Sequence, residues 1–87
     1  MDIREWQSTL NKAFSTVRPR GVRFQFFTDF KDKSIELWRE GGKKPTGAKE
    51  ETHGAETWYG FTMVADHPVT REQAESHLRA LFTGFGV

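Results

Sequence analysis

Residues 22–39 read VRFQFFTDFKDKSIELWR, and this stretch predicts a hairpin of two antiparallel strands. Apolar and polar side chains alternate along its first half, which is typical of a strand with one buried face. A second strand is expected over residues 34–39, with Ile35 and Leu37 facing inward. Only Lys31–Lys33 separate the two runs, so a tight turn must join them.

Burial on one face constrains how the two strands pair. Even-numbered residues of the first strand must oppose odd-numbered residues of the second, because a shift by one residue would turn every apolar side chain to solvent. A two-residue turn at Asp32–Lys33 predicts that Phe27 lies opposite Trp38.

The two ends of the chain predict amphipathic helices over residues 2–17 and 70–83. In the first, the apolar residues recur at intervals of three and four, so they share one helical face. These residues are Ile3, Trp6, Leu10, Ala13, Phe14 and Val17. In the second helix the apolar stripe is formed by Ala74, Leu78, Leu81 and Phe82. Both helices are therefore expected to bury one side against the predicted sheet.

Both helices also carry start signals. Asp2 with Glu5 and Thr70 with Gln73 have the spacing of a capping box. In this motif the first side chain accepts a hydrogen bond from the amide three residues later, and the later side chain accepts one from the amide of the first residue. Val69 and Ala74 are spaced for a hydrophobic staple at the second helix. Gly84 is expected to cap its C-terminus.

Residues 40–56 form a long polar segment without a large apolar residue, so we expect a flexible loop. A third strand is predicted over residues 57–65, with Tyr59 inward and Trp58 outward. Gly60 on its outer side leaves a gap or admits a close neighbour.

These elements predict one α+β domain over residues 1–87. Its expected architecture is helix, three-stranded antiparallel meander, helix, with both helices packed on one face of the sheet.

The opposite, outer face of the sheet is the most informative feature for function. Large aromatic side chains on a solvent face often mark a binding surface. The predicted partner-binding residues are Phe27, Trp38, Trp58, Arg23, Gln25 and Thr62. The same aromatic residues could instead stabilise the sheet through cross-strand pairs, form a homodimer contact, or stack nucleic-acid bases.

Basic residues form a second candidate surface. The first 49 residues carry a net charge of +5 and the remainder −4, within a total of +1. Clustered cations can hold phosphate groups, although a lysine-bearing glycine loop is more often simply solvated. The candidate phosphate-binding residues are Arg18, Arg20, Lys43, Lys44 and Lys49.

The composition argues against several other classes of function. The 87 residues include no cysteine, which excludes a disulfide scaffold and a thiol nucleophile. His53, His67 and His77 have neither metal-ligand spacing nor a catalytic partner, so we expect no enzyme activity, no metal site and no cofactor. No apolar run is long enough to span a membrane, and a cytoplasmic location is expected.

The predicted order of elements resembles that of double-stranded RNA-binding domains. The resemblance covers most of the chain, as an order of helices and strands only. The loop Lys31–Lys33 lacks that family's Gly-Pro-x-His pattern, and Arg71 is the only basic residue in the first turns of the last helix. No site residue is therefore carried over from the family.

The sequence as a whole favours a small interaction protein without catalytic activity. We expect it to bind another protein, or a second copy of itself, through the outer face of the sheet. Its size suits a regulator, inhibitor or assembly factor such as bacteria and their viruses encode. The alternative is a nucleic-acid-binding module that uses the sheet aromatics together with the Arg and Lys residues.

Overall fold

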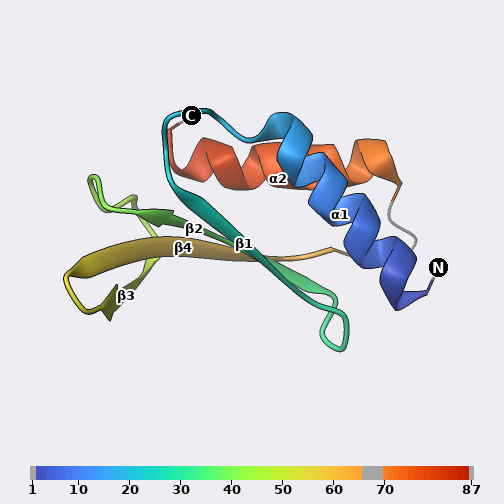
Figure 1. Cartoon of the computed structure of the whole chain (residues 1–87), viewed down its shortest axis with the longest axis horizontal. Helices are drawn as coiled ribbons and strands as arrows, with labels where there is room; N and C mark the ends of the chain where they lie inside the picture. Colours follow the sequence, from blue (N-terminus) through green and yellow to red (C-terminus); the bar gives the residue numbers. More distant parts are fainter. Residues whose placement is uncertain (1, 66–69, 87) are drawn as a thin grey trace.

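The fold is α+β, with a helix near each end of the chain and an antiparallel sheet between them (Figure 1). The structure is a computed structural model that describes residues 2–65 and 70–86. The elements are α1 (Ile3–Val17), β1 (Phe24–Asp29), β2 (Ser34–Glu40), β3 (Lys49–His53), β4 (Glu56–Val64) and α2 (Arg71–Gly84). The fold class and the positions of both helices agree with the sequence prediction.

Both helices begin at the capping residues predicted for them. Asp2 accepts a hydrogen bond from the Glu5 amide at 2.9 Å. At α2, the Thr70 hydroxyl accepts from the Gln73 amide at 3.1 Å, and the Gln73 side chain accepts from the Thr70 amide at 2.9 Å. These bonds satisfy amides that have no partner inside the helix. Val69 of the predicted staple lies outside the described residues.

The C-terminus of α2 differs from the prediction. Gly84 is the last helical residue and Phe85 is the C-cap. A Cβ atom on Gly84 would lie 2.9 Å from the Phe61 ring, so this glycine serves close packing instead of ending the helix. The positive φ that favours glycine after a helix occurs at Gly86, where φ is 82°.

The sheet has four strands instead of the predicted three. Their order is β1-β2-β4-β3, so β4 is central and β3 forms an edge. β3 lies inside the polar segment 40–56, and the prediction of a loop along that whole segment is wrong. A two-residue turn joins β3 to β4, and its first residue, Gly54, has φ 63°. Glycine at that position is typical of a tight hairpin. The α-β-β-β-β-α order also departs from the three-strand order on which the family resemblance rested.

The pairing of β1 with β2 keeps the predicted parity but is shifted by two residues. Phe27 lies opposite Glu36, and Gln25 lies opposite Trp38. The predicted Phe27–Trp38 pair is wrong because the turn is longer than two residues. Asp29 accepts hydrogen bonds from the amides of Lys31 and Asp32, and Lys33 takes a left-handed conformation with φ 54°. Such side-chain bonds to nearby amides stabilise wider turns.

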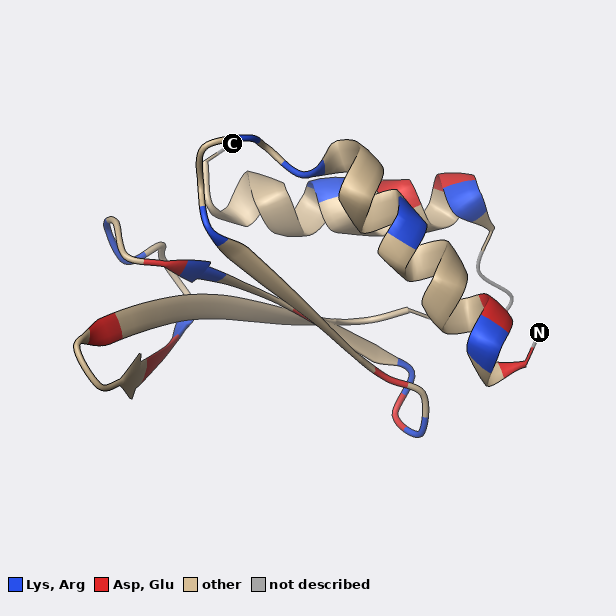
Figure 2. Cartoon of the chain, viewed as in Figure 1, with Lys and Arg blue, Asp and Glu red and all other residues tan. Residues whose placement is uncertain are grey.

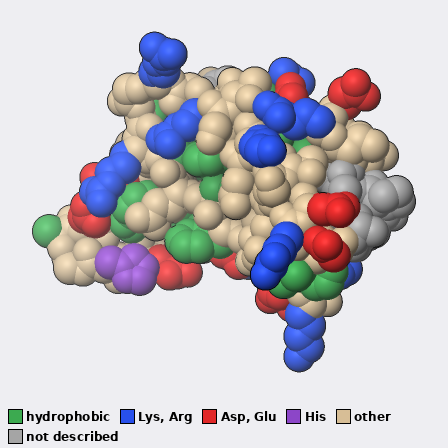
Figure 3. All heavy atoms as spheres, turned by 45° about the vertical axis from the view of Figure 1, so that its right-hand side comes forward, with side chains coloured by type: hydrophobic (Ala, Val, Ile, Leu, Met, Phe, Trp, Pro, Cys, Tyr) green, Lys and Arg blue, Asp and Glu red, His purple; other side chains and the backbone are tan. Residues whose placement is uncertain are grey.

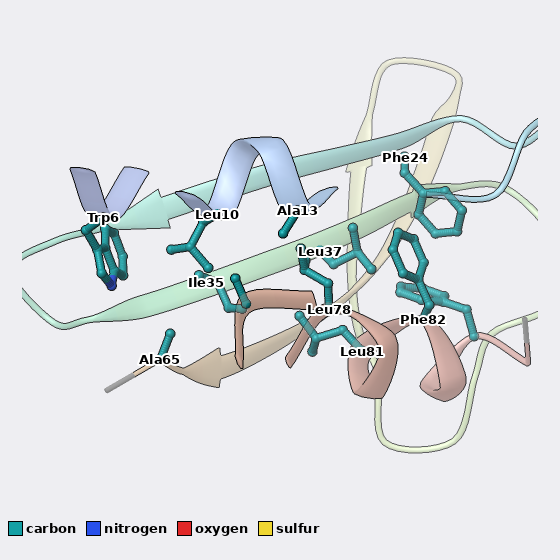
Figure 4. Packing of buried hydrophobic residues seen from close by; sticks show 12 residues of the cluster. Trp6, Leu10, Ala13, Phe24, Ile35, Leu37, Ala65, Leu78, Leu81 and Phe82 are labelled. Carbon is teal, nitrogen blue, oxygen red and sulfur yellow. The ribbon is translucent and has the colours of Figure 1, made fainter. Parts of the chain in front are cut away.

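The hydrophobic core lies between the two helices and one face of the sheet (Figure 4). Leu10 of α1 and Leu78 of α2 are fully buried together with Ile35 and Leu37 of β2. Aromatic side chains extend this core toward the C-terminal end of α2. The rings of Phe14 and Phe26 stack at 5.1 Å, and those of Phe24 and Phe82 meet edge to face at 4.9 Å. The inward faces of β1, β2 and β4 are those predicted from alternation.

Within the described residues, neither helix has the length and apolar character needed to cross a membrane.

The hairpin that adds β3 can be tested at its turn. Gly54→Ser is expected to lower the free energy of unfolding by about 1 kcal/mol, because a residue with a Cβ is strained at positive φ. Ala55→Ser, at the second turn position, is the matched control and should cost less than about 0.5 kcal/mol. Urea unfolding measures both. Equal effects of the two substitutions would contradict the turn described here.

Candidate functional site

The candidate site is a hollow on the face of the sheet opposite the helices, which we call the outer hollow. Its volume is about 580 Å³, and all four strands contribute side chains to it. The lining residues are Gln25, Phe27, Glu36, Trp38, Glu51, His53, Glu56 and Trp58. A concave surface with several aromatic walls and a few polar groups is the usual form of a binding site.

The first wall of the outer hollow is Trp38, which packs over Gly60. The two residues are paired across β2 and β4. A Cβ atom built on Gly60 would lie 2.3 Å from the indole ring, closer than real contacts allow. The indole therefore occupies the space that any larger residue at position 60 would need. Its N–H donates to Glu36 Oε1 at 2.9 Å, which fixes its orientation. The close neighbour that the sequence allowed at Gly60 is thus Trp38.

Trp58 forms a second wall and is covered by Arg23. The guanidinium carbon of Arg23 lies 5.3 Å from the centre of the indole, within the range of a cation–π contact. Arg23 also forms an ion pair with Glu56 on the same face. Trp58 is consequently held between its own strand and a charged side chain.

The two tryptophans are much less exposed than the sequence led us to expect. Only 6% of Trp38 and 5% of Trp58 is accessible, whereas Phe27 is 51% exposed. They point to the predicted face but serve as walls of the outer hollow, and Phe27 presents the large apolar surface. Thr62 lies on the same face beyond the lining residues, and its hydroxyl accepts a hydrogen bond from Lys49 at 3.1 Å.

Sequence reasoning missed all three carboxylates of the hollow and His53: Glu51, His53 and Glu56 fell in the segment predicted as a loop, and Glu36 was not among the predicted site residues. Glu51 and His53 face the same side only because residues 49–53 form a strand. The signal for this hairpin in the sequence is confined to Gly54, a turn residue directly before the predicted strand, because residues 49–53 contain no apolar residue that could alternate.

The outer hollow is negatively charged. Three carboxylates line it, and among the described residues only that of Glu56 is paired with a permanent cation, Arg23. Glu51 contacts the His53 ring at 3.1 Å, and that ring carries charge only when it is protonated. Glu36 accepts from the neutral indole of Trp38. The arrangement favours a cationic group over an anionic one.

The candidate phosphate-binding residues are divided among several places. Arg18 and Arg20 lie in the connection from α1 to β1, on the helix side of the sheet (Figure 2). Lys43 and Lys44 line a smaller hollow of about 310 Å³ beside Phe85, and Lys44 lies 3.9 Å from Glu50. Within residues 2–65 and 70–86, no hydrogen bond or ion pair links these two groups. In Figure 3, Lys and Arg side chains are spread over the visible face.

Arg39 organises the loop that carries those lysines. Its side chain donates to the carbonyl oxygens of Gly41 and Lys43, at 3.1 and 2.6 Å. Its guanidinium carbon lies 5.1 Å from the centre of the Phe85 ring. These contacts place Arg39 on the inner side of the sheet, away from the outer hollow.

Metal binding receives no support from the part of the chain that the structure describes. There, no three His, Asp or Glu side chains come together in a way that could hold a metal ion. His67 lies outside the described residues.

Comparisons with protein families, with curated proteins and with solved structures give no match to this chain. Its function is therefore inferred from the residues themselves.

The packing of Trp38 over Gly60 is tested by a double-mutant cycle. Gly60→Ala should destabilise the protein by about 1–3 kcal/mol, because the added methyl group displaces the indole. In the Trp38→Ala background the same change should cost less than about 0.5 kcal/mol, since the space is then empty. Urea unfolding of the four proteins gives the coupling energy. Additive effects would show that the two residues do not pack as described.

Proposed function

We propose that this protein is a small interaction protein without catalytic activity, which binds another protein through the outer face of its sheet. In this role it would act as a regulator, inhibitor or assembly factor. The observation that carries the proposal is the outer hollow, a preformed concave site with aromatic walls on the face that the helices leave uncovered. Sites of this form are typical places for a partner to dock.

Phe27 would be the main apolar anchor. It is half exposed at the edge of the outer hollow, while Trp38 and Trp58 are already buried in the free protein. Burying an exposed aromatic side chain against a partner releases water and contributes strongly to binding. The two tryptophans would contribute rigid walls, whose order is already established before binding.

The charge of the outer hollow favours a protein over a nucleic acid as the occupant. Glu36, Glu51 and Glu56 would repel a phosphate backbone that approached this face. Base stacking needs an accessible ring face, and those of Trp38 and Trp58 are largely covered. Of the large aromatic residues on this face, Phe27 offers the greatest exposed area.

The nucleic-acid alternative would have to use Arg18, Arg20, Lys43 and Lys44, which lie outside the outer hollow. Titration with short DNA and RNA at low and near-physiological salt separates the two functions. Phosphate binding would give affinity that falls steeply with salt and that Lys43→Ala with Lys44→Ala weakens. That result would replace the present proposal.

The proposal predicts that a single exposed aromatic residue controls partner capture. Tagged protein and a Phe27→Ser variant are incubated with lysate of the source cells, and retained proteins are identified by mass spectrometry. A partner retained by the unchanged protein should be lost with Phe27→Ser, with an affinity decrease of about tenfold or more once it is purified.

Ile3→Ser is the matched control, because Ile3 is 46% exposed on α1 and belongs to the opposite side of the molecule. This variant should retain the partner. If Phe27→Ser retains every protein that the unchanged chain retains, the outer face is not the binding surface.

A further inference from the structure

We propose that the outer hollow receives a guanidinium group, presented as an arginine side chain by the partner protein. This inference rests on the proposed function and specifies the chemistry of the partner at the same site. One side of the hollow already holds an arginine side chain of this protein against an aromatic ring and a carboxylate. The other side has the same two kinds of group but no arginine of its own.

The occupied side is formed by Arg23, Trp58 and Glu56. The guanidinium of Arg23 lies over the Trp58 ring at 5.3 Å and is paired with the carboxylate of Glu56. An indole face and a carboxylate together suit a guanidinium, which stacks on the ring and donates hydrogen bonds to the oxygen atoms. This corner shows that the outer face can hold an arginine side chain.

The other side offers the same two kinds of group without a cation. Trp38 and Glu36 are adjacent there, joined by the indole N–H bond to Glu36 Oε1. Phe27, opposite Glu36 on β1, supplies the accessible ring on this side, because Trp38 is itself buried. In the described interactions of residues 2–65 and 70–86, Glu36 has no cationic partner.

A second carboxylate flanks this position from β3. The register places Glu36 beside Thr62, Trp38 beside Gly60, and Glu51 beside Trp58. Glu36 and Glu51 therefore lie on opposite sides of the row that contains Trp38. A cation over this row would be attracted by both carboxylates and by the half-exposed ring of Phe27.

Lys49 of β3 also lies on the outer face. Lys49 shares the row of Trp38, across Gly60, but its ammonium donates to the Thr62 hydroxyl at 3.1 Å. Lys49 is also not among the residues that line the outer hollow. Among the described residues, neither Glu36 nor Glu51 forms an ion pair with a lysine or arginine, so a partner's cation can pair with them.

Arginine fits this site better than lysine. Its planar guanidinium can stack on an aromatic ring and donate in two directions at once, whereas an ammonium is a compact, strongly hydrated charge. The hollow of about 580 Å³ has room for such a side chain together with neighbouring partner residues.

The experiment uses the indole N–H signals of the whole chain in ¹H–¹⁵N NMR spectra. The protein is titrated with N-acetyl-arginine amide, and in parallel with N-acetyl-citrulline amide, which has nearly the same shape without the charge. The signals of Trp38 and Trp58 should shift with arginine, while that of Trp6, buried in the core, should stay in place. Citrulline should bind about tenfold more weakly or worse.

Two variants test the carboxylates. Glu36→Gln and Glu51→Gln should each weaken arginine binding by about threefold or more, because each removes one negative charge from the site. The amide introduced by Glu36→Gln still has an oxygen that can accept the indole N–H, so the orientation of Trp38 should be kept. Glu72→Gln, on the exposed side of α2, is the control and should bind as the unchanged protein does. The dispersion of the amide spectrum reports whether each variant is folded.

The proposal is overturned if arginine amide leaves both indole signals in place up to its solubility limit. It is also overturned if citrulline binds equally well, or if the two Glu variants bind as Glu72→Gln does. These failures are distinct from failure of the proposed function. A partner that is lost with Phe27→Ser but retained by Glu36→Gln and Glu51→Gln would leave the binding face intact and exclude the guanidinium.

Discussion

The constraint that shapes this protein is that its sheet has two faces and its helices cover only one. The inner face is buried against α1 and α2 in an ordinary hydrophobic core. The outer face is shielded by the sheet's own side chains, chiefly Trp38 lying over Gly60. A glycine in the middle of a central strand would normally weaken it, because it offers no side chain to pack. Here the missing side chain provides the space for a large ring from the neighbouring strand.

The outer hollow follows from that packing. With Trp38 and Trp58 buried as walls, Phe27 is left with the large exposed apolar area among the aromatic residues that line it. The carboxylates at its borders come from β2, β3 and β4, and in the described part of the chain only that of Glu56 has a permanent cation beside it. A concave surface, an exposed aromatic ring and carboxylates without a permanent cation therefore occur together at one place on the outer face. This coincidence is the physical basis for proposing a protein partner there.

Much of the fold could be predicted from local patterns. The helices followed from the spacing of apolar residues such as Leu10 and Leu78, and their starting points followed from the caps at Asp2 and Thr70. The inward faces of three strands followed from alternation. In each case the pattern involves side chains only a few residues apart, and so do the helix turns, caps and strand faces that it predicts.

The features that could not be predicted depend on contacts between distant residues. β3 has no apolar residue, and it is a strand because the backbone of β4 is available to pair with it. The register of β1 against β2 depends on the length of the turn between them, in which the Asp29 side chain accepts hydrogen bonds from two amides. The burial of Trp38 required knowledge that Gly60 lies directly opposite. The negative charge of the candidate site was not predicted for the same reason, since Glu51 and Glu56 reach it only through the β3–β4 hairpin.

The most direct measurement of the central claim is the NMR chemical shift of the two Gly60 α-protons. An indole ring stacked over a glycine shields the protons beneath it and brings them within nuclear Overhauser distance of the ring protons. The account predicts that the Gly60 α-protons resonate well upfield of their ordinary position and show Overhauser contacts to the Trp38 ring. Ordinary shifts without those contacts would contradict it, because Trp38 would then not cover Gly60 and the outer hollow would lack one of its two aromatic walls.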